Sequence, residues 1–184
     1  MSYIPKKTVK HPVNVPLITA IDAFMQTDKY PIGVDFPPSW EEGRELGIGE
    51  LTVKFPLEIN GEIGDQKLII NASPNSANLK FNILITFEPT ICRLDFDETV
   101  IHMNSHAIGT DDIDSIVRGS HYHSWELNKR FFTHSSRPID LHNAISLESN
   151  IRRFDSALRW FCTTNRVILR RDHCIEFPER SLLL

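Results

Sequence analysis

Apolar and polar residues alternate over most of residues 51–97, and this period of two predicts β-strands. We expect strands at Leu51–Ile59, Lys67–Asn71, Leu79–Phe87 and Ile91–Asp97, with Asn60-Gly61 turning the first strand into the second. Short connections between successive strands favour an antiparallel meander, with one face left for a helix to cover. Pro56 cannot donate to a strand ladder, so we expect the first strand to be an edge strand or to be bulged.

Two other stretches repeat their apolar residues at helical spacing. The first predicts a helix that begins near Pro16, ends near Lys29 and presents Leu17, Ile18, Ile21, Phe24 and Met25. The second predicts a C-terminal helix, capped by Asp140, Asn143 or Ser146, that presents Leu147, Ile151, Phe154, Leu158 and Phe161. This helix is the expected cover of the meander, and a last strand is predicted around Arg166–Leu169.

These elements predict the fold class α+β. The expected architecture is an antiparallel β-meander of four to six strands packed against an N-terminal and a C-terminal helix. A length of 184 residues fits a single globular domain over residues 1–184, with residues 1–13 as a loosely attached arm. In the loop from Pro31 to Gly49, Phe36 and Trp40 are expected to anchor the chain to the core.

Composition narrows the class of protein. An apolar content of 41% favours a folded globular chain, and no apolar run approaches the roughly 20 residues that span a bilayer. The N-terminus lacks the apolar segment of a signal peptide, and Cys92, Cys162 and Cys174 are scattered and odd in number. We therefore expect a cytoplasmic protein with reduced thiols and no membrane contact.

Charge is divided unevenly between the two halves of the chain. Residues 1–100 hold 9 Lys and Arg against 14 Asp and Glu, whereas residues 118–171 hold 10 cations, nine of them arginine, against 4 anions. Arginine is the better fork for phosphate and carboxylate groups. The basic half indicates an anionic partner, although helix surfaces that simply carry arginine would look the same.

The densest polar chemistry lies between Arg118 and Arg130. His121, His123 and Trp125 are spaced by two, so in an extended strand all three side chains point to one face. A purely structural strand would carry aliphatic residues there, and the cations Lys129 and Arg130 follow directly. The pattern predicts a site on this strand.

A second polar face is predicted on the fourth strand, where Arg93, Asp95 and Asp97 lie opposite Cys92, Leu94 and Phe96. Alternation alone explains a solvated face. The functional interpretation is that this face continues into His102 and Asn104 and that the histidine strand pairs alongside it. A carboxylate beside an imidazole fixes its tautomer and is expected to raise its pKa.

Three chemistries compete for these residues. Metal-free RNA cleavage would use His121 or His123 as general base, together with His102, and Arg118 or Arg130 on the developing oxyanion. A metal-dependent enzyme would use His121 and His123 with His102 or Asp97 as ligands. Nucleophilic catalysis is disfavoured, because Cys162 falls near an apolar stripe and Ser120 and Ser124 lie in no nucleophile elbow.

Binding without chemistry is the remaining class. On the C-terminal helix Trp160 is predicted to face away from the apolar stripe, flanked by Arg152, Arg153 and Arg159. An outward Trp between arginines is typical of a protein interface or of a base-stacking platform with phosphate contacts. Packing of Trp160 on the Phe36–Trp40 loop is the structural alternative.

The order of these motifs resembles a family of small uncharacterised prokaryotic proteins, a domain of unknown function. The matching runs are Cys92-Arg93-Leu94-Asp95-Phe96, His102-Met103-Asn104, His121-Tyr122-His123 and Phe161-Cys162 followed by Asn165. Ser105-His106-Ala107 replaces a Pro-Asp-Gly turn of that family, and Trp125 replaces a Tyr. The resemblance implies a bacterial protein in which His102, Asn104, His121 and His123 form one group, and it implies no activity.

The preferred hypothesis is a small cytoplasmic prokaryotic protein that binds or processes RNA or another polyanion. Its catalytic residues would be His102, His121, His123, Arg118 and Arg130, and its binding residues Trp125, Lys129, Arg152, Arg153, Arg159 and Trp160. It requires no cofactor and no metal ion. The alternatives are a non-catalytic protein-binding subunit or homo-oligomer, for example in a bacterial defence or mobile-element system, and a metal-dependent enzyme using His102, His121 and His123.

Overall fold

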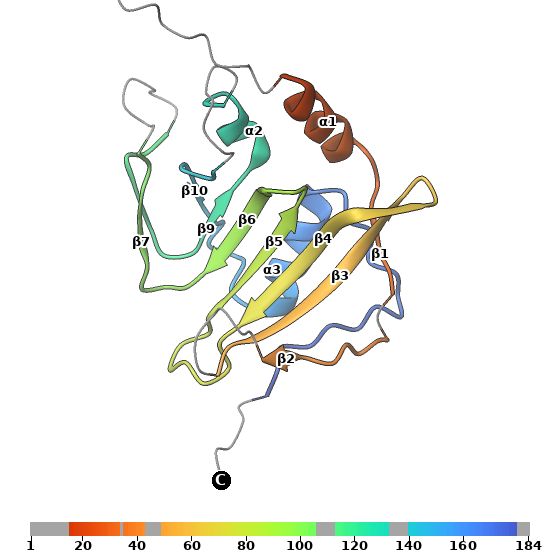
Figure 1. The fold of residues 1–184 in the computed structure, drawn as a ribbon. Helices are drawn as coiled ribbons and strands as arrows, with labels where there is room; N and C mark the ends of the chain where they lie inside the picture. Colours follow the sequence, from red (N-terminus) through yellow and green to blue (C-terminus); the bar gives the residue numbers. More distant parts are fainter. Residues whose placement is uncertain (1–14, 34, 43–48, 106–112, 133–139, 180–184) are drawn as a thin grey trace, which may run out of the picture.

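The computed structural model describes residues 15–33, 35–42, 49–105, 113–132 and 140–179 (Figure 1). The predicted N-terminal arm, residues 1–13, lies outside this range. The elements confirm the α+β class. The helices are α1 (Val15–Gln26), α2 (Trp125–Lys129) and α3 (Phe154–Thr164), and the strands of the meander are β3 (Leu51–Ile59), β4 (Glu62–Ala72), β5 (Phe81–Thr86) and β6 (Thr90–Phe96).

The meander forms the centre of a larger antiparallel sheet. Its order is β1-β3-β4-β5-β6-β9-β10, with β2 also paired to β3. The additional strands are short: β1 (Tyr30–Pro31), β2 (Glu41–Glu42), β9 (His121–His123) and β10 (Ile145–Ser146). A separate hairpin joins β7 (Ile101–Met103) to β8 (Ile116–Arg118). The register shifts between Pro56 and Glu58, so the predicted irregularity at Pro56 is present.

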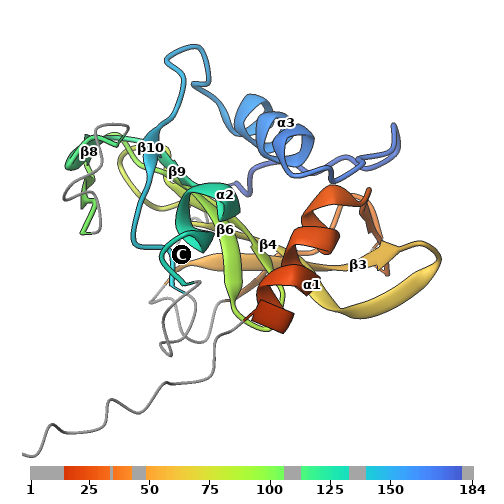
Figure 2. The same cartoon turned by 90° about the horizontal axis from the view of Figure 1, so that it is seen from above.

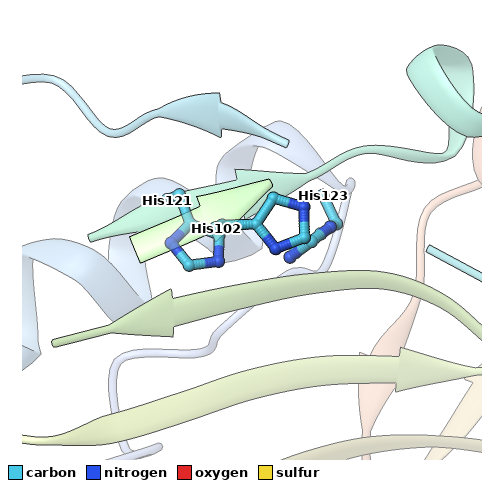
Figure 3. Close-up of side chains that lie close together, drawn as sticks. All are labelled: His102, His121 and His123. Atoms are coloured by element: carbon cyan, nitrogen blue, oxygen red, sulfur yellow. The ribbon is translucent and has the colours of Figure 1, made fainter. Parts of the chain in front are cut away.

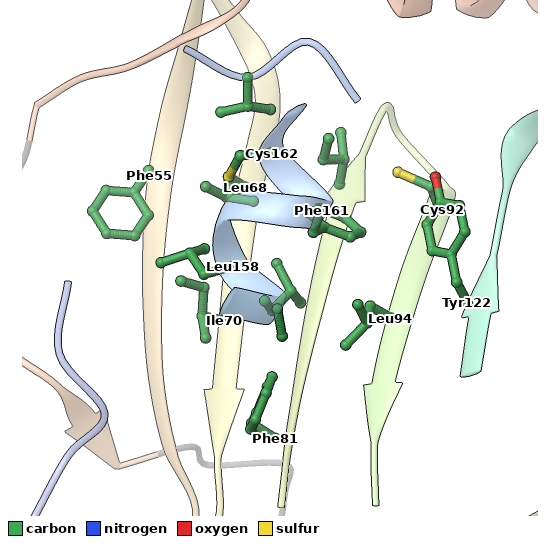
Figure 4. Close-up of a cluster of buried hydrophobic side chains, with 14 of the residues drawn as sticks. Phe55, Leu68, Ile70, Phe81, Cys92, Leu94, Tyr122, Leu158, Phe161 and Cys162 are labelled. Carbon is green, nitrogen blue, oxygen red and sulfur yellow. The ribbon is translucent and has the colours of Figure 1, made fainter. Parts of the chain in front are cut away.

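Helix α3 lies against one face of the sheet and closes the main core (Figures 1, 2 and 4). Alternate residues of β3 to β6 and of β9 point toward it, including Phe55, Leu68, Ile83, Leu94 and Tyr122. The helix contributes Phe154, Ala157, Leu158, Phe161 and Cys162 to this core. The opposite face of the sheet therefore receives the polar residues of the same strands, which positions the site described below.

The predicted C-terminal helix is present, but its predicted start is wrong, and so is the strand predicted after it. The last helix begins at Phe154, with Arg153 as its N-cap, and not near residue 147. Leu147 and Ile151 still pack against the core, but from the segment before the helix. The predicted last strand is absent from the described C-terminal residues, where Val167 makes only an isolated parallel bridge to Lys29. Apolar spacing reports burial, and an irregular segment that follows the core surface can reproduce it by chance.

The N-terminal half is held by α1 and by the loop after it. Ile21 and Phe24 of α1 are buried, and Phe24 packs edge-on against Phe87 with ring centroids 5.2 Å apart. The helix ends at Gln26, three residues before its predicted end. Phe36 stacks on Phe55 at 5.6 Å, which confirms that this loop is anchored to the core.

Lys29 is fully buried where α1 meets the end of α3. Its Nζ donates to the carbonyl oxygens of Thr27 at 2.7 Å, Asn165 at 3.0 Å and Met25 at 3.4 Å. Burial lowers the pKa of Lys29 from 10.5 to about 8, because desolvation disfavours the ammonium form. Lys29 thus links the segment after α1 to the end of α3, and its burial disfavours the charged form of the side chain.

We expect Lys29→Met to change the pH dependence of stability. Between about pH 8 and pH 10.5 the unfolded chain binds a proton that the folded chain does not, so wild-type stability gains with rising pH. Relative to Lys29→Met, the free energy of unfolding should rise by about 3 kcal/mol across this window. Urea denaturation of both proteins from pH 7 to 11 measures it, and a difference that stays constant would show that Lys29 titrates normally.

Candidate metal centre

Three histidines meet on the face of the sheet opposite α3 (Figure 3). Strand β9 pairs with β6, as the sequence predicted, so that His121 lies opposite Asp95 and His123 lies opposite Arg93. Directly opposed residues of an antiparallel pair share a face. Tyr122, between the two histidines, points to the core, and its hydroxyl donates to Asn165 Oδ1 at 2.8 Å. His102 comes from β7, and one ring nitrogen from each histidine lies within 4.8 Å of the other two.

Backbone carbonyls fix the tautomer of every ring. His121 Nδ1 lies 2.9 Å from Gly119 O, His123 Nδ1 lies 3.0 Å from Asn143 O, and His102 Nε2 lies 3.0 Å from His142 O. A carbonyl oxygen only accepts, so each of these nitrogens donates its hydrogen. In the neutral rings the lone pairs therefore reside on His121 Nε2, His123 Nε2 and His102 Nδ1.

Asp95 places a carboxylate oxygen against two of these lone pairs. Its Oδ2 lies 3.4 Å from His121 Nε2 and 3.3 Å from His123 Nε2. These distances exceed the 2.7–2.9 Å or so of a charge-assisted hydrogen bond. Arg93 holds the same oxygen through Nε at 2.8 Å, and its Nη2 donates to His123 Nε2 at 3.3 Å. The second contact independently requires a lone pair on His123 Nε2.

The pKa shifts of His102, His123 and Asp95 favour the binding of a cation. Burial lowers the pKa of His123 and His102, because desolvation disfavours the imidazolium and outweighs the attraction of Asp95. Asp95 raises the pKa of both rings as expected, but the effect of burial is larger, so that the net shift of each pKa is downward. Asp95 keeps a pKa well below its ordinary value: its own burial opposes this, but the Arg93 guanidinium, whose Nε donates to Asp95 Oδ2 at 2.8 Å, prevails. An ionised carboxylate therefore lies beside the Nε2 atoms of His121 and His123.

Two of the ligand separations fit a tetrahedral ion. Zinc holds nitrogen and oxygen ligands at about 2.0–2.1 Å, which places two tetrahedral ligands about 3.3–3.4 Å apart. The separations of Asp95 Oδ2 from the two Nε2 atoms have these values. The histidine nitrogens themselves are spread over as much as 4.8 Å, so an ion would draw the rings together. His102, His121, His123 and Asp95 are the residues that would hold it.

Two buried asparagines position the carbonyls that orient the rings. Asn104 donates to Ala144 O at 2.8 Å and accepts from Ala144 N at 2.7 Å, while Asn128 donates to Asn143 O and accepts from Asn143 N, both at 2.9 Å. These bonds fix residues 142–144, which supply the acceptors for His102 and His123. Hydrogen bonds behind metal-ligating histidines tune both orientation and basicity. Asn104 thus belongs to the histidine group as support and not as a contact residue.

We expect Asn104→Asp to destabilise the protein by about 2–4 kcal/mol. The substitution keeps the shape of the side chain but turns its donor into an acceptor, which then faces the carbonyls of Asp114 and Ala144. Urea denaturation measures the loss. Asn150→Asp, on an exposed residue, is the matched control and should stay within about 0.5 kcal/mol of wild type. Equal stability of the two variants would contradict the supporting role of Asn104.

The structure separates the other predicted catalytic residues from the histidines. His102 lies opposite Val117 in the β7–β8 pair, so Arg118, the next residue, points to the other side and is exposed. Arg130 follows α2 and lies over the ring of Phe131, with its guanidinium carbon 5.0 Å from the centroid. Asp97, the alternative metal ligand, pairs with Lys80 at 3.4 Å. The histidines meet Arg93 and Asp95 instead.

Trp125 and Lys129 serve the contact between α2 and α1. The strand ends at His123, so Trp125 does not share its face, contrary to the prediction. Trp125 is buried and donates from Nε1 to Asp22 Oδ1 at 2.7 Å, and Lys129 pairs with the same oxygen at 2.9 Å. Both side chains already have structural partners in this contact.

The residues predicted on α3 are only partly placed as expected. Arg152, Arg153 and Arg159 are exposed. Trp160 is half-buried and packs edge-on against Tyr122 with centroids 5.0 Å apart, so the prediction that it faces outward is wrong. Cys162 is buried, and desolvation raises its pKa to about 12, which agrees with its expected role in core packing.

Two concave surfaces adjoin these residues. A pocket of about 340 Å³ opens beside the histidines and is lined by His102, His121, Arg93, Asp95, Asn82 and Lys80, among others. A cleft of about 740 Å³ lies between α3 and the segment that follows it. It is lined by Arg159, Arg166, Arg170, Arg171, His173 and Asp28, among others. Arg166 pairs with Asp28 at 2.7 Å. The described residues include no acidic partner for Arg159, Arg170 or Arg171.

The sequence places Arg93 and Asp95 on a polar face beside the histidine strand, but it does not mark them as catalytic, binding or metal-ligating residues. The alternation of the fourth strand placed them on one face, and the pairing of that strand with the histidine strand was the signal that would have joined them to the site. Without the register, Arg93, Asp95 and Asp97 were equivalent. The register brings the first two to the histidines and leaves the third two residues farther along.

No family model, curated protein or solved structure matches this chain. Within the described residues, the model contains no helix of the length and apolarity needed to cross a bilayer.

Proposed function

We propose that this protein is a metal-dependent enzyme whose centre is a divalent transition ion held by His102, His121, His123 and Asp95. The single observation that carries the proposal is the grouping of one ring nitrogen from each of three histidines within 4.8 Å, with Asp95 Oδ2 at 3.4 Å from His121 Nε2 and 3.3 Å from His123 Nε2, the spacing of tetrahedral ligands. Zinc is the ion we favour, because imidazole and carboxylate ligands in a tetrahedral arrangement suit it.

The burial of the histidines also supports metal binding over metal-free proton transfer. His121 is 2% exposed and His123 is fully buried, so neither ring has the access that a general base needs to reach a bulky substrate. His102 is half-buried and lines the pocket together with His121. An ion between them would be reached from the pocket, while the two buried rings need no exposure to act as ligands.

The ion would supply Lewis acidity to a substrate in the pocket and lower the pKa of bound water. The residues of the chain would orient the metal ligands and contact the substrate. The carbonyls of Gly119, His142 and Asn143 keep the three ring lone pairs directed inward. Arg93 donates to Asp95 and holds it in place. Polar side chains on this face of the sheet line the pocket and would contact a substrate there.

Zinc binding to the wild-type chain tests the proposal. Protein stripped with EDTA and dialysed should take up one zinc ion, counted by native mass spectrometry. Zinc at 100 times its dissociation constant should raise the free energy of unfolding by about 2.7 kcal/mol. Zinc, cobalt, nickel, manganese and ferrous iron are compared in the same way. If none of them binds with one ion per chain and stabilises the fold, the proposal is wrong.

A second candidate function rests on the arginine cleft. We propose that RNA phosphates bind there, which retains the sequence-based hypothesis of a polyanion partner but moves its location. Three guanidiniums without an acidic partner in the described chain line one cleft, and like charges held together favour an anion. Among the residues predicted to bind, Arg159 lines this cleft.

The salt dependence of RNA binding, compared between variants inside and outside the cleft, tests this candidate. A labelled mixed-sequence RNA is titrated in EDTA, where a metal centre plays no part, and each neutralised phosphate should contribute about −0.7 to the slope of log affinity against log salt. Arg159→Glu/Arg170→Glu should reduce the slope by about 1.4. Arg118→Glu, on an exposed arginine outside the cleft, is the control. Equal binding by both variants would remove the cleft from the interface.

A further inference from the structure

We infer that the pocket beside the histidines binds a small substrate through an oxyanion group, a carboxylate or a phosphate, held jointly by the metal ion and Arg93. This inference rests on the proposed metal centre and names the class of ligand that the same site takes.

The hydrogen bonds of Arg93 provide the first argument. Its Nε donates to Asp95 Oδ2 and its Nη2 donates to the lone pair of His123 Nε2 at 3.3 Å. An ion bound to His123 would take that lone pair, so Nη2 would lose its acceptor while Nε kept Asp95. Arg93 is 38% exposed and lines the pocket, and a guanidinium presents its remaining N–H groups in a fork that fits an oxyanion.

Charge balance gives the second argument. The centre has one carboxylate, Asp95, and one guanidinium, Arg93, which neutralise each other. A divalent ion therefore leaves two positive charges at a half-buried site. Of the other charged residues in the pocket lining, Lys80 and Asp97 pair with each other at 3.4 Å, and Glu50, which accepts a hydrogen bond from Ser73, adds one negative charge, so that one net positive charge remains. An anionic ligand supplies the missing negative charge.

The pocket also limits the size and polarity of the ligand. Its volume of about 340 Å³ is near the lower end for small-molecule sites, which excludes a strand of RNA. Asn71, Asn82, Asp95 and His121 lie in register across β4, β5, β6 and β9. Asn71 Nδ2 donates to Asn82 Oδ1 at 2.8 Å, which leaves Asn82 Nδ2 as a donor beside the centre. The ligand is therefore a small, polar oxyanion with further hydrogen-bonding groups.

Calorimetry with inorganic phosphate and with acetate tests the inference, using protein loaded with one equivalent of zinc and protein in EDTA. Both anions, or the one that matches the natural group, should bind only to the zinc-loaded chain. Arg93→Gln should weaken anion binding to the zinc-saturated chain at least tenfold. Because Arg93 also holds Asp95, zinc affinity is measured separately and should fall by less than anion affinity does. Arg118→Gln, on an arginine that points away from the site, should bind zinc and anions as wild type does.

The outcomes distinguish the two proposals. Failure of zinc to bind would remove the metal centre and this inference together. Zinc binding without any anion binding, or equal anion binding by wild type and Arg93→Gln, would overturn only the inference. A fall in zinc affinity as large as the fall in anion affinity in Arg93→Gln would show that Arg93 acts on the site only through Asp95, which would also contradict the inference.

Discussion

His121→Ala/His123→Ala is expected to lower zinc affinity at least about 10⁴-fold. Structural zinc sites contribute about 10–16 kcal/mol of binding free energy, so each of four ligands accounts for about 2.5–4 kcal/mol. The double variant removes two of them and leaves His102 and Asp95. Native mass spectrometry and zinc-dependent melting curves measure the effect, and the stabilisation by zinc should disappear.

Controls must separate ligand loss from unfolding, because His121 and His123 are buried. His102→Ala removes a half-buried ring from the hairpin, so it should fold normally and still weaken zinc about 100-fold. His142→Ala is matched to it, since His142 contributes its carbonyl and not its ring to the site. Zinc binding that survives in His102→Ala and in the folded double variant would locate the ion elsewhere.

Phe161→Ala is expected to lower the free energy of unfolding by about 3–5 kcal/mol. The ring is fully buried between α3 and the sheet, and its centroid lies 5.9 Å from that of Tyr122 (Figure 4). Because Tyr122 lies between the two histidines of β9, a cavity beneath it should also loosen the metal centre. Urea denaturation with an unchanged m-value measures the stability, and zinc titration measures the affinity.

Thr164→Ala is the matched control for this helix, because Thr164 is exposed and lies in the same element. Its free energy of unfolding should remain within about 0.5 kcal/mol of wild type. A loss below about 1 kcal/mol in Phe161→Ala would mean that α3 does not close the core in the way described.

The local spacing of apolar residues was sufficient to predict the strands at the centre of the sheet. The meander from Leu51 to Phe96 is predicted because apolar and polar residues alternate along half-buried strands. Short turns connect each strand to the next. The local spacing was insufficient near the C-terminus, where Leu147 and Ile151 fit a helical stripe but reach the core from an irregular segment. Burial produces the same apolar spacing whether or not the backbone is helical.

The candidate site shows the same division. The sequence indicated that His102, Asn104, His121 and His123 act as one group, and the structure brings the three rings together with Asn104 behind them. It did not indicate that Arg118 points away, since the side of a hairpin on which a residue lies depends on register. It also could not indicate that Asp95, and not Asp97, faces the histidines.

The sequence by itself determined the α+β class, the four-stranded meander and the presence of a polar histidine strand beside it, because these follow from contacts between neighbours along the chain. Only the tertiary structure decided what the histidines do. Their tautomers depend on the carbonyls of Gly119, His142 and Asn143, two of which lie 20 or more residues from the rings they orient. Their partner Asp95 is selected by the register of two strands that are distant in sequence. Lone-pair direction is a property of three-dimensional hydrogen bonding, and no spacing along the chain encodes it.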